Sequence, residues 1–295
     1  MISIIITSFK EPETIGKCIE SIISQNIKYD YELIVSAPDI ETLMVAKSYK
    51  AKEPRIKLFK DPGKGKSYAL NLIFKKLQGD VFILTDGDVY MSDGSINNIM
   101  EHFKEDNVGC VTGRPVPQEH RSDQYGYWAN FLFDAAHDLR KSLHDAGNFL
   151  ECSGYLWAFR NNVVSDLPLD VAEDTVMPYF FQEKGYKIRY EENAKVYVKN
   201  ADNWEDWLKQ KIRTSKAHET LNKYVDTNLA EKTKSFSNES KGLKYLFTHP
   251  NNLKEFYWTL KLIMARLNMW IRVFYDTKIK NKQYTDNWER VDSTK

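Results

Sequence analysis

Val81-Phe82-Ile83-Leu84-Thr85-Asp86-Gly87-Asp88-Val89 is the stretch of this sequence that decides the fold. Its first four residues form a short apolar run, which is typical of a buried strand. The run leads into two aspartates separated by one glycine, and ligands bind beyond the carboxyl ends of strands in open α/β sheets. Carboxylates also suit a hard divalent cation, which often shares oxygen ligands with substrate phosphates. Because Asp-Gly is equally common in plain turns, these residues alone leave a cation site and a turn both open.

The overall composition limits the class of protein. The 295 residues carry 42 Lys and Arg against 41 Asp and Glu, a net charge of +1. Nucleic-acid binders use a basic excess or stripe to displace counterions, so no nucleic-acid partner is expected. Three scattered cysteines without a Cys-x-x-Cys pair indicate neither a disulfide framework nor a zinc site.

The location of the protein is predicted from its apolar segments. The opening residues 1–6 are apolar but lack the basic region and cleavage site of a signal peptide. No run of about 20 apolar residues is present, so no ordinary membrane span is expected. We therefore predict a cytoplasmic protein, with peripheral contact at the inner face of the cell membrane as an open possibility.

Strand-like and helix-like segments alternate on both sides of the opening stretch. This alternation predicts an α/β fold with a mostly parallel sheet flanked by helices. Glycine-rich dinucleotide and Walker fingerprints are both absent. The expected strands are 2–7, 31–37, 56–59, 81–84, 108–112, 153–160, 187–190 and 195–198, and the expected helices are 12–25, 40–49, 67–77, 95–103, 125–143, 173–185 and 204–214.

Three further charged features accompany the two aspartates. The loop 61–67 combines glycines with Lys64 and Lys66 just before a helix, which favours an anion but also fits a solvated turn. Glu173-Asp174 is a second acidic pair, and by itself it is an acidic first turn of a helix. Arg213 is either a surface charge or a phosphate ligand. His218, shortly after it, is either a surface histidine or a further metal ligand.

The last quarter of the chain has a different character. Residues 219–244 are polar and rich in lysine, which predicts a linker. Residues 256–275 form an amphipathic helix too apolar to be exposed all round. It either packs on the rest of the protein, which we favour, or lies in a membrane interface. The predicted division is a domain at 1–218, a linker at 219–244 and a helical C-terminal extension at 245–295.

The order of these motifs resembles family 2 glycosyltransferases, inverting enzymes with the GT-A fold. The resemblance covers about residues 2–214. Thr85-Asp86-Gly87-Asp88 matches the family's Asp-x-Asp metal motif, and Glu173-Asp174 matches its Glu-Asp pair. Three other segments are similar to the opening strand and nucleotide loop, the Gly-Lys-x-x-Ala-Leu-Asn segment and the Gln-x-x-Arg-Trp motif: Ile4-Ile5-Ile6-Thr7-Ser8-Phe9-Lys10-Glu11, Gly65-Lys66-Ser67-Tyr68-Ala69-Leu70-Asn71 and Gln210-Lys211-Ile212-Arg213-Thr214.

The resemblance implies a role for each matching residue. Asp88 and Asp86 would hold Mn²⁺ or Mg²⁺, with Asp86 also beside the ribose. Asp174 would be the catalytic base, with Glu173 beside it. The residues implied for the nucleotide sugar are Thr7, Ser8, Glu11, Asp39, Lys66, Asn71, Asp86 and Arg213. Two departures from the family pattern stand out. Pro38 comes between the second strand and Asp39, and Thr214 replaces the tryptophan of processive members.

The implied function is metal-dependent, inverting transfer of a sugar from a nucleotide diphosphate sugar, first of all a UDP-sugar. The acceptor would be a saccharide hydroxyl or a polyprenyl-lipid phosphate. Two alternatives are a catalytically inactive glycan- or membrane-binding module and a sugar nucleotidyltransferase. The latter would need a glycine- and arginine-rich signature after the first strand, and residues 7–11 offer none.

Overall fold

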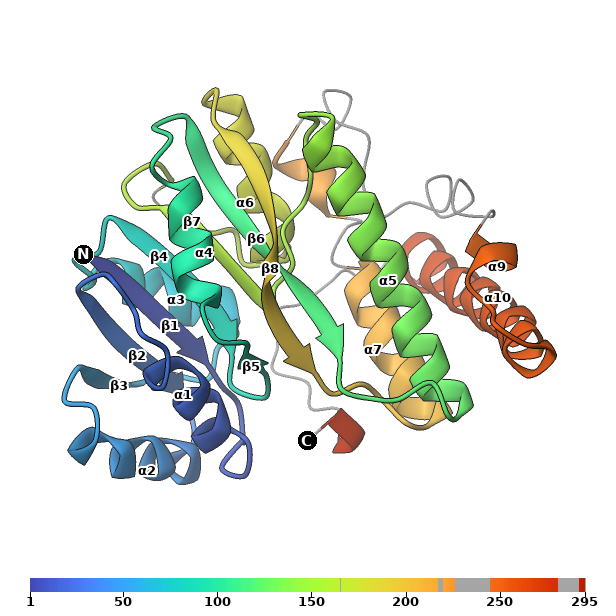
Figure 1. Cartoon of the computed structure of the whole chain (residues 1–295), viewed down its shortest axis with the longest axis horizontal. Coiled ribbons are helices and arrows are strands. Elements are labelled where there is room, and N and C mark those ends of the chain that lie inside the picture. Colours follow the sequence, from blue (N-terminus) through green and yellow to red (C-terminus); the bar gives the residue numbers. More distant parts are fainter. Residues whose placement is uncertain (165, 217–219, 226–244, 281–291, 295) are drawn as a thin grey trace.

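The computed structural model describes residues 1–164, 166–216, 220–225, 245–280 and 292–294 (Figure 1). Their strands form one eight-stranded mixed sheet in the order β3-β2-β1-β4-β7-β6-β8-β5. The strands are β1 (Ile2–Thr7), β2 (Tyr31–Ala37), β3 (Ile56–Lys60), β4 (Val81–Asp86), β5 (Tyr90–Met91), β6 (Val108–Pro117), β7 (Leu156–Arg160) and β8 (Lys187–Val198). The helices are α1 (Ile15–Ile23), α2 (Ile40–Ser48), α3 (Lys66–Phe74), α4 (Ser95–His102), α5 (Gln124–Asp145), α6 (Glu173–Glu183), α7 (Trp204–Lys216), α9 (Tyr245–Thr248) and α10 (Leu253–Phe274).

The first four strands along the sheet are parallel, as the alternating pattern predicts. β1 lies between β2 and β4, and Thr7 pairs in register with Ser36 on one side and Asp86 on the other. Beyond β4 the sheet becomes mixed, because β7 runs antiparallel to both β4 and β6. The predicted α/β fold with a mostly parallel sheet is confirmed.

Alternate residues of each strand face opposite sides of the sheet, so two cores form. Ile4 belongs to the core under α1, α2 and α4, while its neighbour Ile5 belongs to the core under α3 and α6. β1 and β4 are buried almost along their whole length, which explains why they read as continuous apolar runs.

The strands predicted at 187–190 and 195–198 are wrong as separate elements, since the structure has one twelve-residue strand, β8. The register against β6 shifts between Gly113 and Arg114, so that Glu191 and Lys195 pair with consecutive residues. Such a bulge keeps the backbone extended while it interrupts the side-chain pattern. The polar residues Glu192 and Asn193 therefore look like a turn in the sequence.

A third group of helices stands at the β6–β8 side of the sheet, where α5, α7 and α10 pack together (Figure 1). Their core is aromatic and includes Tyr127, Trp128, Trp207 and Trp258. The prediction that the C-terminal amphipathic helix packs on the rest of the protein is confirmed. None of the helices in the described ranges combines the length and apolar character that crossing a bilayer requires.

The predicted linker is described only at its start. Leu221 is fully buried in the core beside α6, and the Thr220 hydroxyl donates to the backbone oxygen of Asp170 at 2.6 Å. Residues 220–225 therefore belong to the α/β domain, because they bury apolar side chains in its core. Residues 226–244, like His218, lie outside the described residues.

Candidate active site

The carboxyl ends of β1, β2 and β4 meet at one edge of the sheet, and Asp86 is the last residue of β4. Asp86 Oδ1 accepts hydrogen bonds from Thr7 Oγ1 at 3.1 Å and from Lys66 Nζ at 2.7 Å. The in-register pairing of Thr7 with Asp86 brings the first of these contacts about directly. Two residues that are 79 positions apart in the sequence thus meet where the parallel strands end.

Lys66 joins the two acidic pairs. It is the first residue of α3, and its ammonium group contacts Asp86 Oδ1 at 2.7 Å and Glu173 Oε1 at 2.8 Å. Burial alone would lower the pKa of Lys66, but the charges of Asp86 and Glu173 and their hydrogen bonds raise it well above its ordinary value. The lysine therefore remains charged and holds β4 and the start of α6 together.

Asp88 is half-buried, and its carboxyl is affected by the charge of Asp86. Burial, followed by the charge of Asp86, raises the pKa of Asp88 to about 7, although Lys66 and Arg213 oppose the increase. A divalent cation would relieve this repulsion. No group of three or more Asp, Glu, His or Cys side chains suited to a metal occurs in the described part of the chain. The two aspartates therefore fit a cation whose other ligands are phosphate oxygens and water, which is how Mg²⁺ is usually bound.

The glycine between the aspartates is required by packing. A Cβ atom at Gly87 would lie 2.4 Å from Ser8 Oγ and 2.7 Å from Glu11 Oε2. Ser8 in turn donates to Glu11 at 2.6 Å, and both side chains are buried. The loop after β1 therefore packs directly against the acidic loop after β4, which places Ser8 and Glu11 beside Gly87.

Asp174 and Glu173 point to different partners although they are neighbours in the first turn of α6. Glu173 is buried against Lys66, whereas Asp174 Oδ2 accepts a hydrogen bond from the backbone N–H of Gly154 at 2.7 Å. A Cβ atom at Gly154 would lie 3.1 Å from the same oxygen. Gly154 thus allows the backbone to approach the Asp174 carboxylate closely.

Tyr155 is a residue that reasoning from the sequence did not select. Burial raises the pKa of its phenol, and so do the charges of Asp88, Asp86 and Asp174, while Arg213 lowers it. Charged groups from α6, α7 and the acidic loop therefore all act on this hydroxyl. Its ring also stacks on Phe133 of α5, with centroids 6.2 Å apart. The only signal in the sequence is the neighbouring Gly154, just before β7, since glycine allows a close approach to the backbone.

Two predicted nucleotide residues have structural contacts of their own. Asp39 caps α2 by accepting from the backbone N–H of Thr42 at 2.9 Å, and it also accepts from Lys10 N at 2.8 Å. Burial would raise the pKa of Asp39, but these hydrogen bonds bring it below its ordinary value. Asn71 holds the backbone of Leu167 through both amide atoms, at 2.7 and 2.9 Å. Asp39 orders the loop after β1, and Asn71 orders the segment that precedes α6.

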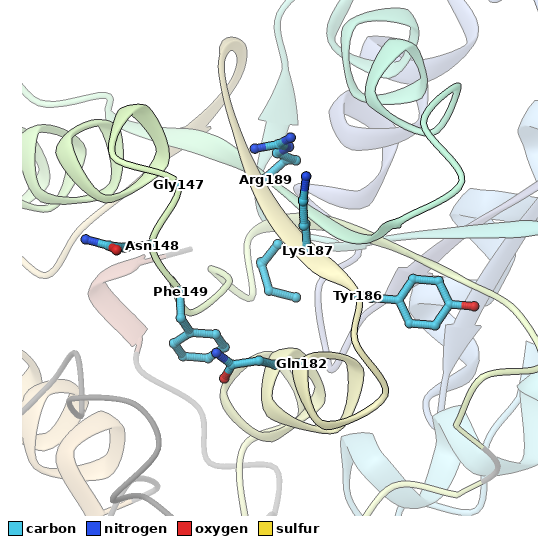
Figure 2. A pocket seen from close by; sticks show the side chains of 8 residues that line it. Gly147, Asn148, Phe149, Gln182, Tyr186, Lys187 and Arg189 are labelled. Carbon is cyan, nitrogen blue, oxygen red and sulfur yellow. The ribbon is translucent and has the colours of Figure 1, made fainter.

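A small polar hollow lies elsewhere, between the loop after α5, the end of α6 and the start of β8. Figure 2 shows Gln182 and Lys187 among its lining side chains. None of the residues discussed above lines this hollow. The charged cluster at the strand ends is therefore the candidate site.

Comparisons with known proteins agree with this geometry. Residues 3–167 match the model of glycosyl transferase family 2. The chain is 22% identical to a hyaluronan synthase of Streptococcus pyogenes over 167 residues, which cover 52% of this chain and 40% of the synthase. It is 26% identical to a poly-beta-1,6-N-acetyl-D-glucosamine synthase of Staphylococcus aureus over 230 residues, which cover 75% of this chain and 55% of that protein. The chain thus spans about half the length of these curated relatives.

Solved structures share the fold. The crystal structure of S. aureus TarS 1-349 in complex with UDP-GlcNAc superposes with a TM-score of 0.53 at 14% sequence identity, covering 99% of this chain and 83% of that one. The fold is that of GT-A glycosyltransferases. Since the family model covers more than half of the sequence and the acidic motifs meet at the strand ends, the chain belongs to glycosyl transferase family 2.

Proposed function

We propose that this protein is a metal-dependent, inverting glycosyltransferase that moves a sugar from a nucleotide diphosphate sugar to an acceptor. The observation that carries the proposal is the Lys66 bridge, which unites Asp86 of the first acidic pair with Glu173 of the second. The pair Asp86 and Asp88 suits the diphosphate end of a donor, and the pair Glu173 and Asp174 suits the acceptor end.

The donor would lie along the edge formed by the loops after β1 and β4. Thr7, Ser8 and Glu11 border this edge, and Asp39 and Asn71 order its flanking segments. Mn²⁺ or Mg²⁺ at Asp86 and Asp88, when bound, would neutralise charge on the diphosphate leaving group. Lys66 and Arg213 add positive charge at the same place, since both act on the Asp88 carboxyl.

Asp174 is the proposed general base. The acceptor hydroxyl oxygen forms a bond to the anomeric carbon while the bond from that carbon to the diphosphate oxygen breaks, and the hydroxyl proton passes to Asp174. Attack from the face opposite the leaving group inverts the anomeric centre. Glu173 is already paired with Lys66, so it would position the lysine while Asp174 takes the proton. A positioned base of this kind contributes about 10²–10⁴-fold to the rate.

For the donor and the acceptor we propose chemical classes. The structural neighbour's ligand, UDP-GlcNAc, makes uridine diphosphate sugars the first donors to test. A saccharide hydroxyl is the acceptor that needs a base, whereas a polyprenyl-lipid phosphate would need none. We further propose a cytoplasmic location and a transferase domain that extends beyond the predicted 1–218 to include 220–225, followed by the rest of the predicted linker, 226–244, and a C-terminal extension at 245–295.

Calorimetry with UDP and Mn²⁺ or Mg²⁺ tests the donor site. We expect cation-dependent nucleotide binding that Asp88→Ala abolishes. Asp93→Ala is a matched control, because Asp93 is exposed and only five residues further along the chain. Unchanged binding in Asp88→Ala would contradict the proposed site.

A screen of the common sugar nucleotides, with nucleotide release as the readout, tests the reaction. We expect turnover with one donor in the presence of an acceptor and a divalent cation. If the protein binds nucleotide but turns over no donor with any acceptor, the inactive binding module replaces the enzyme. If, in a parallel assay supplied with a nucleoside triphosphate and a sugar 1-phosphate, it makes a sugar nucleotide and releases pyrophosphate, it is a nucleotidyltransferase.

A further inference from the structure

Helix α10 has two apolar stripes, and only one of them faces the protein. The buried stripe packs on α5 and α7 and includes Trp258, Leu262, Ala265, Met269 and Val273. The other stripe is exposed and repeats at alternating intervals of four and three residues. Its members, which we call the outer stripe, are Leu253, Tyr257, Leu260, Met264, Leu267, Ile271 and Phe274.

The outer stripe is fixed in place from behind. Arg121 forms two hydrogen bonds with Glu255, at 2.7 and 3.2 Å. The Tyr127 and Thr259 hydroxyls lie 2.6 Å apart, and Trp128 Nε1 donates to Trp258 O at 2.8 Å. These contacts hold α10 against α5, so that the outer stripe cannot turn inward without breaking buried polar contacts.

The stripe extends onto α9. Phe247 of α9 is 75% exposed, and its ring lies 6.4 Å from that of Phe256. Figure 1 shows α9 and α10 side by side at the end of the molecule beyond α5. An exposed apolar surface with so many members is unusual for a side that remains in water.

The exposed charges of α10 itself are all of one sign. The exposed charged residues of α10 are Lys254, Lys261 and Arg272, and both of its lysines lie over aromatic rings of the same helix. The acid of α10, Glu255, is buried on the opposite side. Basic side chains at the margin of an apolar face can keep their charges at the lipid headgroups while their stems lie along the apolar surface.

This charge pattern distinguishes between two occupants. The spacing of the outer stripe would also suit a coiled coil with a second copy of α10. Flanking positions in a coiled coil normally pair opposite charges, but a second copy would offer the same exposed lysines and no exposed acid from this helix. A surface of anionic lipids complements both the apolar stripe and the basic margin.

We propose that the outer stripe of α10, together with Phe247, docks on the surface of an anionic lipid bilayer, with the helix lying parallel to it. This inference concerns a surface outside the candidate active site, so it stands or falls separately from the proposed reaction.

The test is flotation of the full chain with vesicles made of equal parts phosphatidylcholine and phosphatidylglycerol, compared with phosphatidylcholine alone. We expect binding to the mixed vesicles and a loss of about tenfold or more in Met264→Glu, since an apolar contact is replaced by a charge that the lipid repels. Met44→Glu on α2 is the matched control, because Met44 is 58% and Met264 71% exposed. It should float like the unchanged protein.

A second variant covers the case in which Met264→Glu does not fold. Lys254→Ser with Lys261→Ser removes two exposed charges and leaves the buried stripe intact, and each change should weaken binding about fivefold. The proposal is overturned if the unchanged protein does not bind the mixed vesicles, or if both variants float with them as the unchanged protein does. It is also overturned if sedimentation shows a dimer that Met264→Glu converts to a monomer, because a second copy then covers the outer stripe.

Discussion

The candidate active site is half-buried and the core of the helical layer of α5, α7 and α10 is buried, and opposite kinds of contact hold the two regions. At the site, Lys66 lies between Asp86 and Glu173, and every one of these groups is charged. In the helical layer, large rings such as Trp128 and Trp258 fill the space, and the partly buried ion pair of Arg121 and Glu255 lies at its edge. Charged contacts fix the direction of a few atoms, whereas apolar contacts fix the position of whole helices.

This difference in contacts determines how well each region tolerates substitution. In the site, removing one group leaves its partner charged and buried, so the damage extends to the neighbours. In the helical layer, an apolar residue matters only through the area it buries. The inner and outer sides of α10 therefore differ in their contribution to stability, although their compositions are similar.

The largest effect on activity is expected at Asp174, the proposed general base. Asp174→Asn should lower the turnover number by about 10²–10⁴-fold, because an amide cannot accept the acceptor's proton. Donor affinity measured by calorimetry should stay the same, since the substitution keeps the size of the side chain. Glu183→Gln, at the exposed end of α6, is the control and should retain full activity. Equal losses in the two variants would refute a specific role for Asp174.

The next effect tests the charged cluster itself. Lys66→Met should reduce the free energy of unfolding by about 3–5 kcal/mol, because Asp86 and Glu173 lose their shared partner. The pKa of Lys66 is raised by folding, so its contribution is complete below the ordinary lysine pKa and is lost only at higher pH. Denaturant unfolding at neutral pH should therefore show the full difference.

Lys75→Met is the matched control for that experiment. Lys75 pairs with Asp166 at 3.1 Å, but both side chains are more than half exposed. Such surface pairs contribute about 0–1 kcal/mol. A loss in Lys66→Met no greater than in this control would show that the bridge does not hold the site together.

Two methionines of α10 allow the buried and the exposed stripe to be compared within one helix. Met269 is fully buried, and Met269→Ala should cost about 2–5 kcal/mol of unfolding free energy. Met264 is mostly exposed, and Met264→Ala should change the unfolding free energy by less than about 0.5 kcal/mol. Thermal or denaturant unfolding without lipid measures both. Similar losses at the two positions would mean that the outer stripe is covered within the protein.

The smallest effect concerns the ion pair at the edge of the helical layer. Glu255→Gln should lower the free energy of unfolding by about 2 kcal/mol. This is less than the loss expected on breaking a fully buried ion pair, because Arg121 is partly exposed. Burial would raise the pKa of Glu255, but Arg121 and the Asn251 N–H lower it. The contribution is therefore present above the ordinary glutamate pKa of about 4.3 and is lost as the pH falls through the folded value.

Nucleotide binding distinguishes the two regions in this last variant. Calorimetry with UDP and a divalent cation should give the same affinity for Glu255→Gln as for the unchanged protein, since Glu255 touches none of the site residues. A marked loss of affinity would instead mean that the helical layer supports the site through α7, which carries Arg213.

The sequence by itself predicted the parts of the fold that depend on local pattern. Continuous apolar runs gave β1 and β4, because strands buried on both faces carry no alternation. It also placed the end of the fourth strand at 84 and the start of the next helix at 67, close to the observed Asp86 and Lys66, since glycines and charges mark both places. Local pattern failed at β8, where a bulge keeps one strand continuous through polar residues.

The tertiary structure alone decided which of these residues meet. Asp86, Lys66 and Glu173 come from three separate elements, so no spacing in the sequence could show that one ammonium group joins both acidic pairs. It also separated Glu173 from Asp174, gave Asp39 and Asn71 their structural contacts, and added Tyr155. For α10, the sequence showed an apolar helix, and only the packing showed that one of its two apolar stripes remains exposed. Contacts between distant residues depend on how the elements pack in space, which is why local periodicity cannot specify them.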